Sequence, residues 1–172
     1  MAFFRAPQGN VHPAVKGAAA ATAVWLTVAI TIVSAFEGFA SKPYVDRVGT
    51  GHPETWCYGM TKAEGPPPPY SKVFTKAECQ GYLGPGLQKY DTGIKQCIHV
   101  PMPPHREAAM VSAAYNLGVA GVCRSAMVRN LNAGHVQAAC DALLQYNRAQ
   151  GRVLAGLTRR RQQERLLCLM EI

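Results

Sequence analysis

The chain has 172 residues, a length that suits one domain with a substantial core. Its 18 Lys and Arg residues outnumber the 10 Asp and Glu residues, which gives a formal net charge of +8. This charge favours an anionic partner, such as nucleic acid, a membrane surface or a cell wall, and a polyanionic wall fits it better than a small neutral substrate.

The N-terminal region contains an uncharged run from Gly17 to Phe36, preceded by Arg5 and Lys16. Twenty residues in a helix span about 30 Å, the thickness of the hydrocarbon core of a bilayer. Positive charges before such a run keep that end in the cytoplasm and favour export of the rest. The run is weakly apolar, because one glycine, seven alanines, three threonines and one serine make up 12 of its 20 residues.

Three interpretations of this run stay open at the level of the residues. It is an uncleaved anchor that leaves the bilayer easily, a signal peptide cleaved near Val33-Ser34-Ala35, or a buried helix of a soluble domain. We favour the anchor, which divides the chain into a cytoplasmic tail with a signal-anchor segment (1–36) and an exported domain (37–172).

Residues 43–61 predict a small irregular antiparallel sheet, because they mix Tyr, Val, Thr and Trp with Gly and Pro. The run GPPPP at 65–69 predicts a loop. Thr75 and Glu78 form a capping box, so a helix is expected to begin there and to end near Leu83.

An Ala-rich central helix is expected after Pro104, with Gly118 as its C-terminal stop. Further helices are expected at about 124–132, 135–147 and 158–170. The sequence therefore predicts an α+β fold that is mostly helical, with a small antiparallel sheet and an apolar N-terminal helix.

Six dispersed cysteines follow residue 56, and no two are close enough for a CxxC pair. Their even number favours disulfides in an oxidising compartment over buried free thiols. Several complete pairings are possible, and we predict pairing in sequence order, because each bond then links neighbouring elements. The predicted pairs are Cys57–Cys79, Cys97–Cys123 and Cys140–Cys168.

Glu37 and Asp46 are the first candidates for chemistry. Hydrolysis of a glycosidic bond uses two carboxyl groups, one that protonates the leaving oxygen and one that acts as a base or electrostatic partner. A Glu at the end of an apolar helix and an Asp on a following turn can face each other across a cleft. The pair alone is a weak signal, because most Glu and Asp side chains are solvated.

The stretch EGFASKPYVDRVGTGHPETWCYGMT (37–61) resembles the signature of phage-type lysozymes, glycoside hydrolase family 24. The family pattern is E-G-x-x-x-x-x-Y-x-D, a Gly, then T-x-G/C-Y-G-H-T. Later segments resemble family landmarks in the same order, namely AAYNLG (113–118), LNAG (131–134) and GLTRRRQQE (156–164). The resemblance covers roughly residues 37–170 and implies a lysozyme-like fold.

The resemblance also implies roles for particular residues. Glu37 would be the general acid, Asp46 would orient the attacking water and stabilise an oxocarbenium-like transition state, and Thr55 would hold that water. Asn116 resembles a position that lines the substrate cleft. The implied reaction is hydrolysis, with inversion, of the bond between N-acetylmuramic acid and N-acetylglucosamine in peptidoglycan.

Two departures from the family pattern concern this region. Eight residues separate Asp46 from Thr55, where the family usually has five, and we attribute the surplus to a longer hairpin tip within GTGHPE. Without an insertion His52 takes the Thr position, and Thr50 is a weaker rival. Met60 replaces a common family His, whose loss should affect stability more than chemistry.

Two other groups of residues, an arginine run and the histidines, are candidates for charge contacts or metal binding. The run Arg159–Arg161 is interpreted first as a solvated helix face, with contact to wall carboxylates or an ion pair beneath the cleft as alternatives. A zinc amidase is disfavoured, because the five histidines show no HExxH or comparable spacing. The sequence predicts neither a metal nor a cofactor.

The N-terminus resembles that of signal-anchor-release members of the family. The resemblance implies export by the host secretion machinery, tethering to the host inner membrane with the catalytic domain in the periplasm, and later release. Cleavage after Ala35 would leave Glu37 on a frayed terminus, which favours retention of the segment. The expected partners are peptidoglycan and that membrane, without nucleic acid, and the protein is expected to be a monomer.

Two other functions remain as alternatives. A lytic transglycosylase acts on the same bond with one catalytic acid, and the Asp46 and Thr55 matches count against it. A membrane-tethered wall-binding protein without activity is the alternative from another class.

Overall fold

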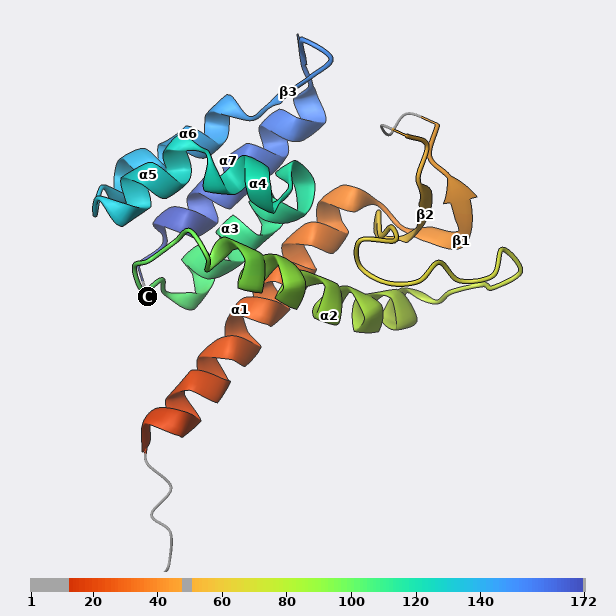
Figure 1. Cartoon of the computed structure of the whole chain (residues 1–172), viewed down its shortest axis with the longest axis horizontal. Coiled ribbons are helices and arrows are strands. Elements are labelled where there is room, and N and C mark those ends of the chain that lie inside the picture. Colours follow the sequence, from red (N-terminus) through yellow and green to blue (C-terminus); the bar gives the residue numbers. More distant parts are fainter. Residues whose placement is uncertain (1–12, 48–50, 172) are drawn as a thin grey trace, which may run out of the picture.

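The computed structural model describes residues 13–47 and 51–171, with side chains from Val24 onward. Seven α-helices, one short 3₁₀-helix and two small hairpins follow one another along this part of the chain (Figure 1). Their bounds are α1 (Pro13–Glu37), β1 (Ala40–Val45), β2 (Glu54–Cys57), α2 (Lys76–Ile94), α3 (Pro104–Leu117), α4 (Val119–Cys123), α5 (Ala126–Asn132), α6 (Val136–Ala142), η1 (Leu143–Gln145), β3 (Arg148–Ala149), β4 (Arg152–Val153) and α7 (Ala155–Leu169). The predicted α+β class is confirmed.

Helix α3 lies at the centre of the helical body, and α1, α2 and α7 pack against it. Its alanines at 108, 109, 113 and 114 are fully buried, and such small side chains let the neighbouring helices approach closely. Pro104 begins the helix and Gly118 ends it with φ of 77°, a conformation that favours glycine. The expected central helix and its stop are confirmed.

Helix α1 is part of this core. Trp25, Ala29 and Val33 are buried and spaced four residues apart, so they form one stripe along the helix. Helix α1 packs on α3 and α2, and the Lys95 ammonium of the segment after α2 lies 5.9 Å from the centre of the Trp25 ring. Within the described residues, no helix has the length and apolarity that a membrane crossing needs.

The predicted irregular antiparallel sheet is the β1–β2 hairpin. Tyr44 pairs with Thr55 and Val45 with Glu54, and an irregularity separates these pairs from the pairing of Ala40 with Cys57. A tight turn follows β2, and Trp56 exchanges both main-chain hydrogen bonds with Met60 at 3.0 Å. This hairpin projects from the helical body beside the end of α1 (Figure 1).

Helix boundaries are where the sequence prediction was wrong. Helix α2 continues to Ile94 although Pro85 lies inside it, because Leu83, Leu87 and Ile94 are fully buried and their packing outweighs the local cost of proline. The helix expected at 135–147 ends at Ala142 and continues as η1. The β3–β4 hairpin was not foreseen.

All three predicted disulfides are present, namely Cys57–Cys79, Cys97–Cys123 and Cys140–Cys168. The first joins β2 to α2, the second joins the end of α2 to α4, and the third joins α6 to α7. Each bond therefore connects elements that follow one another or pack together, as the pairing in sequence order assumed.

We expect replacement of both Cys140 and Cys168 with Ser to lower the free energy of unfolding by about 2–4 kcal/mol, because the unfolded chain gains freedom when a loop is opened. Both sulfurs are buried, so their loss also removes packing. Urea unfolding of the oxidised parent and the variant measures the difference. An unchanged midpoint would contradict a stabilising role for this bond.

Candidate active site

Glu37 is the last residue of α1, and Gly38 then turns the chain toward β1 with φ of 71°. The Glu37 side chain is 20% exposed and faces the turn after β2. A Cβ atom added at Gly59 would lie 3.1 Å from Glu37 Oε2, and Gly59 also has φ of 75°. Glycine is therefore required at this motif position both by backbone conformation and by the close approach of the carboxyl group.

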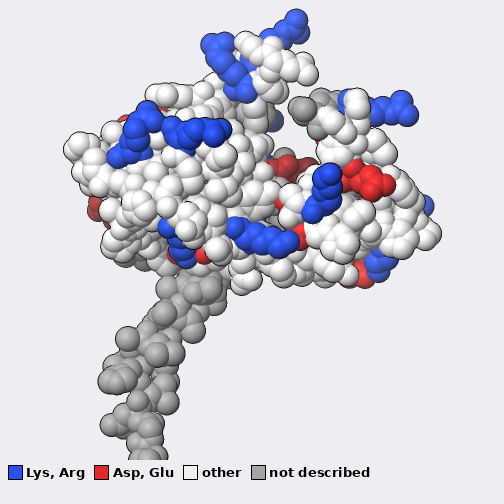
Figure 2. All heavy atoms as spheres, viewed as in Figure 1, with Lys and Arg blue, Asp and Glu red and all other residues white. Residues whose placement is uncertain are grey.

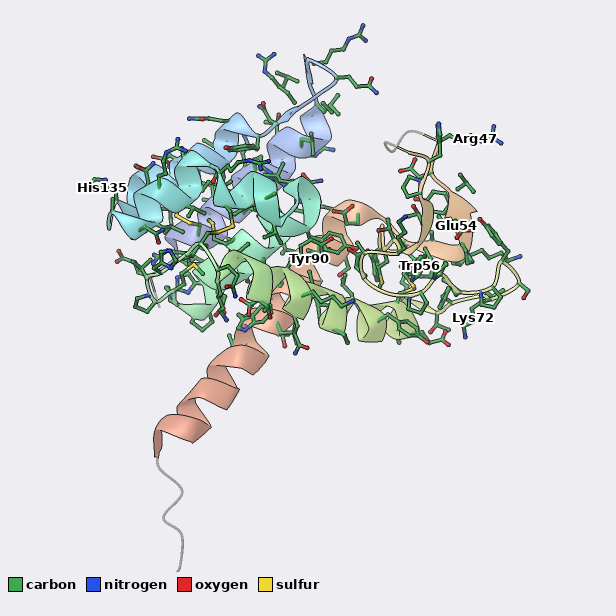
Figure 3. All side chains as sticks on the ribbon, viewed as in Figure 1. Arg47, Glu54, Trp56, Lys72, Tyr90 and His135 are labelled. Atoms are coloured by element: carbon green, nitrogen blue, oxygen red, sulfur yellow. A yellow bond between two sulfur atoms is a disulfide. The ribbon has the colours of Figure 1, made fainter. Side chains whose placement is uncertain are left out.

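Asp46 and Thr55 lie at the same end of the β1–β2 hairpin. The Asp46 amide donates to the Pro53 carbonyl at 3.0 Å, directly beyond the paired strands. The Thr55 side chain is buried, and its hydroxyl donates to the same carbonyl at 3.1 Å. Figure 3 shows the neighbours of these two residues in the sequence, with Arg47 near the outer end of the hairpin and Trp56 at its base.

Tyr44 connects the two carboxyl groups electrostatically. Burial raises the pKa of the Tyr44 phenol, and the charges of Asp46 and Glu37 raise it further. Glu37 is the last residue of α1 and Asp46 directly follows β1, so the two carboxyl groups flank the first strand of the hairpin.

Of the rival residues for the third position, His52 is the one that the structure describes. His52 is exposed in the connection between the strands, with φ of 49°. Thr50 lies outside the described residues. Met60, where the family commonly has His, is buried in the core against Trp56.

Arg160 of α7 holds the Glu37 carboxyl from the helical side. Its guanidinium is 3% exposed and forms an ion pair with Glu37 Oε1. The same group donates to Glu164 at 3.0 Å and to the Ser112 carbonyl at 3.1 Å, so α7 and α3 fix its position. The ring of Phe36 lies 5.9 Å from this guanidinium.

Glu164 is the centre of this buried network. It accepts hydrogen bonds from the Ser112 hydroxyl at 2.6 Å and from the Arg161 guanidinium at 3.1 Å. Burial raises the pKa of the Glu164 carboxyl, and the two neighbouring guanidinium groups oppose that shift. Arg161 also donates to Asn116 Oδ1 at 3.1 Å. This bond links the network to Asn116, the residue that was predicted to line the substrate cleft.

The predicted solvated face is wrong for two of its three arginines. Arg160 and Arg161 are buried and form ion pairs, as the last of the alternatives expected, whereas Arg159 is exposed. The spacing of Arg160 and Glu164, four residues apart, was the signal in the sequence, because such pairs meet on one helix face.

A pocket of about 500 Å³ opens beside this network. Its lining joins α1, α3 and the start of α7, and the residues are Ala35, Phe36, Glu37, Asn116, Leu154, Gly156, Leu157, Arg159 and Arg160. Glu37 and Asn116 are therefore brought to one pocket. A polar recess with a carboxyl group on its wall suits a hydroxyl-rich ligand.

A second network near Glu37 was missed by the sequence analysis. Glu64 accepts from the Thr61 amide at 2.6 Å and from the Tyr90 hydroxyl, and the Tyr115 hydroxyl donates to the Tyr58 carbonyl at 2.8 Å. These bonds tie the segment after β2 to α2 and α3. Nothing in the local sequence pattern pairs Glu64 with a tyrosine 26 positions later.

We expect Glu164→Gln to lower the free energy of unfolding by about 3–5 kcal/mol, because it leaves two buried guanidinium groups without their shared carboxylate. The matched control is Asp141→Asn, which removes the carboxylate partner of Arg165 on the same helix but in an exposed pair. The control should lose much less stability. Equal shifts in urea unfolding for the two variants would contradict a special role for Glu164.

Comparison with known proteins gives a consistent result. Residues 34–164 match the phage lysozyme family. The chain is 34% identical to a SAR-endolysin of Bacteriophage PS119, with 98% of each chain covered, and 34% identical to a SAR-endolysin of Enterobacteria phage P21, with 92% of this chain and 93% of the relative covered. Its fold is similar to a crystal structure of a mutant P22 lysozyme, with 30% identity, a TM-score of 0.72, and coverage of 83% of this chain and 95% of that one.

Proposed function

This chain belongs to the phage lysozyme family, as an endolysin of the muramidase type, and we propose that Glu37, Asp46 and Thr55 carry its reaction. The substrate is the glycan strand of peptidoglycan, cut between N-acetylmuramic acid and N-acetylglucosamine. The observation that supports this assignment is the placement of Glu37 at the end of α1, directly before the hairpin on which Asp46 and Thr55 share the Pro53 carbonyl as their hydrogen-bond acceptor.

Glu37 donates its proton to the glycosidic oxygen as the bond breaks. Arg160 holds one carboxyl oxygen of Glu37, which orients the other oxygen toward Gly59. Asp46 stabilises the positive charge that develops on the sugar ring and orients a water molecule for attack. The Thr55 hydroxyl donates a hydrogen bond to the Pro53 carbonyl, so the hydroxyl oxygen is free to accept a hydrogen bond from that water.

We further propose that the reaction inverts the anomeric configuration. In that mechanism the two carboxyl groups stand about 6.5–9.5 Å apart in the active form, which leaves room for the water. NMR of freshly released products on a soluble glycan oligomer tests this, because the first product then has the α configuration. An initial β product would point to a covalent intermediate on Asp46.

Mass spectrometry of the products from purified peptidoglycan tests the reaction type. Reducing muramic acid ends support hydrolysis, whereas anhydro ends would identify a lytic transglycosylase. Glycan strands that stay intact after incubation would instead support the alternative of a wall-binding protein without catalytic activity. Neither alternative is favoured by the resemblance of the chain to endolysins.

We also propose that residues 1–36 form a cytoplasmic tail and signal anchor, and that 37–172 form the catalytic domain. The host secretion machinery would export the chain, which would stay tethered to the inner membrane and then be released into the periplasm. The SAR-endolysin relatives and the Ala- and Thr-rich run before Glu37 support this order. The packed form of α1 corresponds to the released state, in which Glu37 has reached Arg160.

A further inference from the structure

The β3–β4 hairpin and the start of α7 form a strongly cationic part of the chain. Five arginines fall between residues 148 and 161, and no acidic residue occurs between Asp141 and Glu164. Two of the five are buried in the network that holds Glu37. The other three, Arg148, Arg152 and Arg159, are exposed.

One of these exposed arginines lies at the pocket that contains Glu37, and the other two lie on the hairpin that directly precedes it in the chain. Arg159 lines that pocket together with Leu154 and Gly156, which directly follow β4. Figure 2 shows Lys and Arg atoms on the hairpin that projects from the helical body, above a recess whose base carries Asp and Glu atoms. We call the segment 148–159 the basic lip.

The basic lip is held in place against α7. The Leu154 amide donates to the Asn147 carbonyl at 3.0 Å, and the Asn147 side chain donates to the Thr158 hydroxyl at 3.3 Å. Beside the arginines, Val153 and Leu154 are 52% and 42% exposed. The lip therefore presents cationic groups and an apolar surface together, on a fixed base.

The opposite side of the recess has a different charge. The β1–β2 hairpin carries Lys42 and Arg47 but also Asp46 and Glu54, so its positive and negative charges balance. A ligand that crosses the recess thus meets cations mainly on the side of α7. This asymmetry gives the ligand an orientation.

We propose that the basic lip binds the carboxylates of the peptides attached to the glycan strand. This inference rests on the proposed function and names the part of the substrate that the lip recognises. The sugars of the strand are uncharged when their lactyl groups carry peptides, so the anionic groups come from those peptides. A guanidinium presents paired N–H donors that match a carboxylate, and exposed Val153 and Leu154 suit the methyl groups of short peptides.

Anionic phospholipid is the competing ligand for a cationic surface. The geometry favours the peptide, because Leu154, Gly156 and Arg159 line the same pocket as Glu37. A bilayer resting on the lip would cover that pocket. A peptide attached to a strand in the recess reaches the lip without blocking it.

The test compares two double variants with equal loss of charge. Arg148→Gln/Arg152→Gln alters the lip, and Arg124→Gln/Arg129→Gln alters exposed positions around α5, outside the lip and its pocket. Each double variant loses one exposed hydrogen bond from an arginine side chain to a main-chain carbonyl. In the lip this bond joins Arg148 to Gly151, and near α5 it joins Arg129 to Arg124. The substrates are peptidoglycan with its peptides and glycan strands from which an amidase has removed them.

For the lip variant we expect kcat/KM on peptide-bearing substrate to fall about three- to ten-fold at low salt, mainly through KM, as for a few exposed charge contacts. The loss should shrink at high salt, because the contacts are solvent-exposed. Activity on peptide-free strands and the activity of the α5 variant should stay close to those of the parent. Equal losses on both substrates, or in both variants, would overturn the proposal.

A binding measurement separates this inference from the proposed function. In a Glu37→Gln background, cosedimentation with intact sacculi should weaken with the lip substitutions and not with the α5 substitutions, whether or not the parent is a hydrolase. Binding to vesicles that contain phosphatidylglycerol is measured in parallel. A lip-dependent loss confined to vesicles would assign the surface to lipid and overturn the peptide assignment.

Discussion

Glu37→Gln is expected to abolish lysis while the protein stays folded, with a loss of about 10²–10⁴-fold in the hydrolysis rate on purified peptidoglycan. An amide of the same shape still accepts a hydrogen bond from Arg160, but it has no proton to donate to the leaving oxygen. Turbidity loss of purified sacculi measures the rate, and thermal unfolding shows whether the variant is folded.

The matched control for this prediction is Glu54→Gln, which changes an exposed carboxylate on the neighbouring hairpin. Glu54 accepts a hydrogen bond from the Tyr70 hydroxyl at 2.7 Å and lies outside the pocket of Glu37. This variant should keep nearly all of its activity. A Glu37→Gln enzyme that is folded and nearly as active as the parent would remove Glu37 from the mechanism.

The local part of the candidate site could be predicted because its residues are close in sequence. Glu37, Asp46 and Thr55 fall within one motif of 25 residues, and turn-forming glycines at 38 and 59 mark where the chain reverses. The hairpin register does not follow from this motif, because neither strand alternates buried and exposed residues and an irregularity interrupts the pairing. The motif does not contain the ion-pair partner of Glu37.

That partner comes from the other end of the chain. Arg160 is separated from Glu37 by 123 positions, and its role depends on how α7 packs on α3. A run of three arginines looks like a solvated face until that packing is known. Two of them are buried beside acceptors that come from other elements, since Glu37 and Ser112 accept from Arg160 and Asn116 accepts from Arg161.

The wrong prediction for the C-terminal end of α2 has a similar cause. The segment Gly84-Pro85-Gly86 predicts a helix end from local preferences, yet the helix continues for eight more residues to Ile94. A Cβ atom at Gly84 would lie 3.7 Å from Ile30 of α1, so this stretch is where α2 passes the N-terminal helix. The length of α2 is therefore set by long-range packing, which the local sequence pattern does not indicate.

A second variant tests the proposed release of the N-terminal segment from the membrane. Thr27 and Thr31 lie on the exposed side of α1, opposite the buried stripe of Trp25, Ala29 and Val33. The Thr31 hydroxyl donates to the Thr27 carbonyl at 2.9 Å, so the helix satisfies this polar group itself. Such residues keep an anchor insertable but weakly held, because they contribute little apolar area to the bilayer.

Thr27→Leu/Thr31→Leu should therefore hold the endolysin in the membrane and block lysis. Each change adds about 1–2 kcal/mol of bilayer affinity, from roughly 0.8 kcal/mol per added CH₂ group. We expect the variant to be exported, to remain in the membrane fraction after depolarisation and to leave cells intact, whereas Thr27→Ser/Thr31→Ser should lyse like the parent. Fractionation and culture turbidity measure the two effects.

Purified enzyme distinguishes retention in the membrane from damage to the fold. The leucine variant keeps the stripe of Trp25, Ala29 and Val33 that packs against the helical body, so α1 should still bring Glu37 to Arg160 once the protein is out of the bilayer. Its activity on sacculi in solution should match that of the parent. A variant that is silent in solution would place the defect in docking of α1, and a variant that lyses cells as fast as the parent would show that escape from the bilayer does not set the timing of lysis.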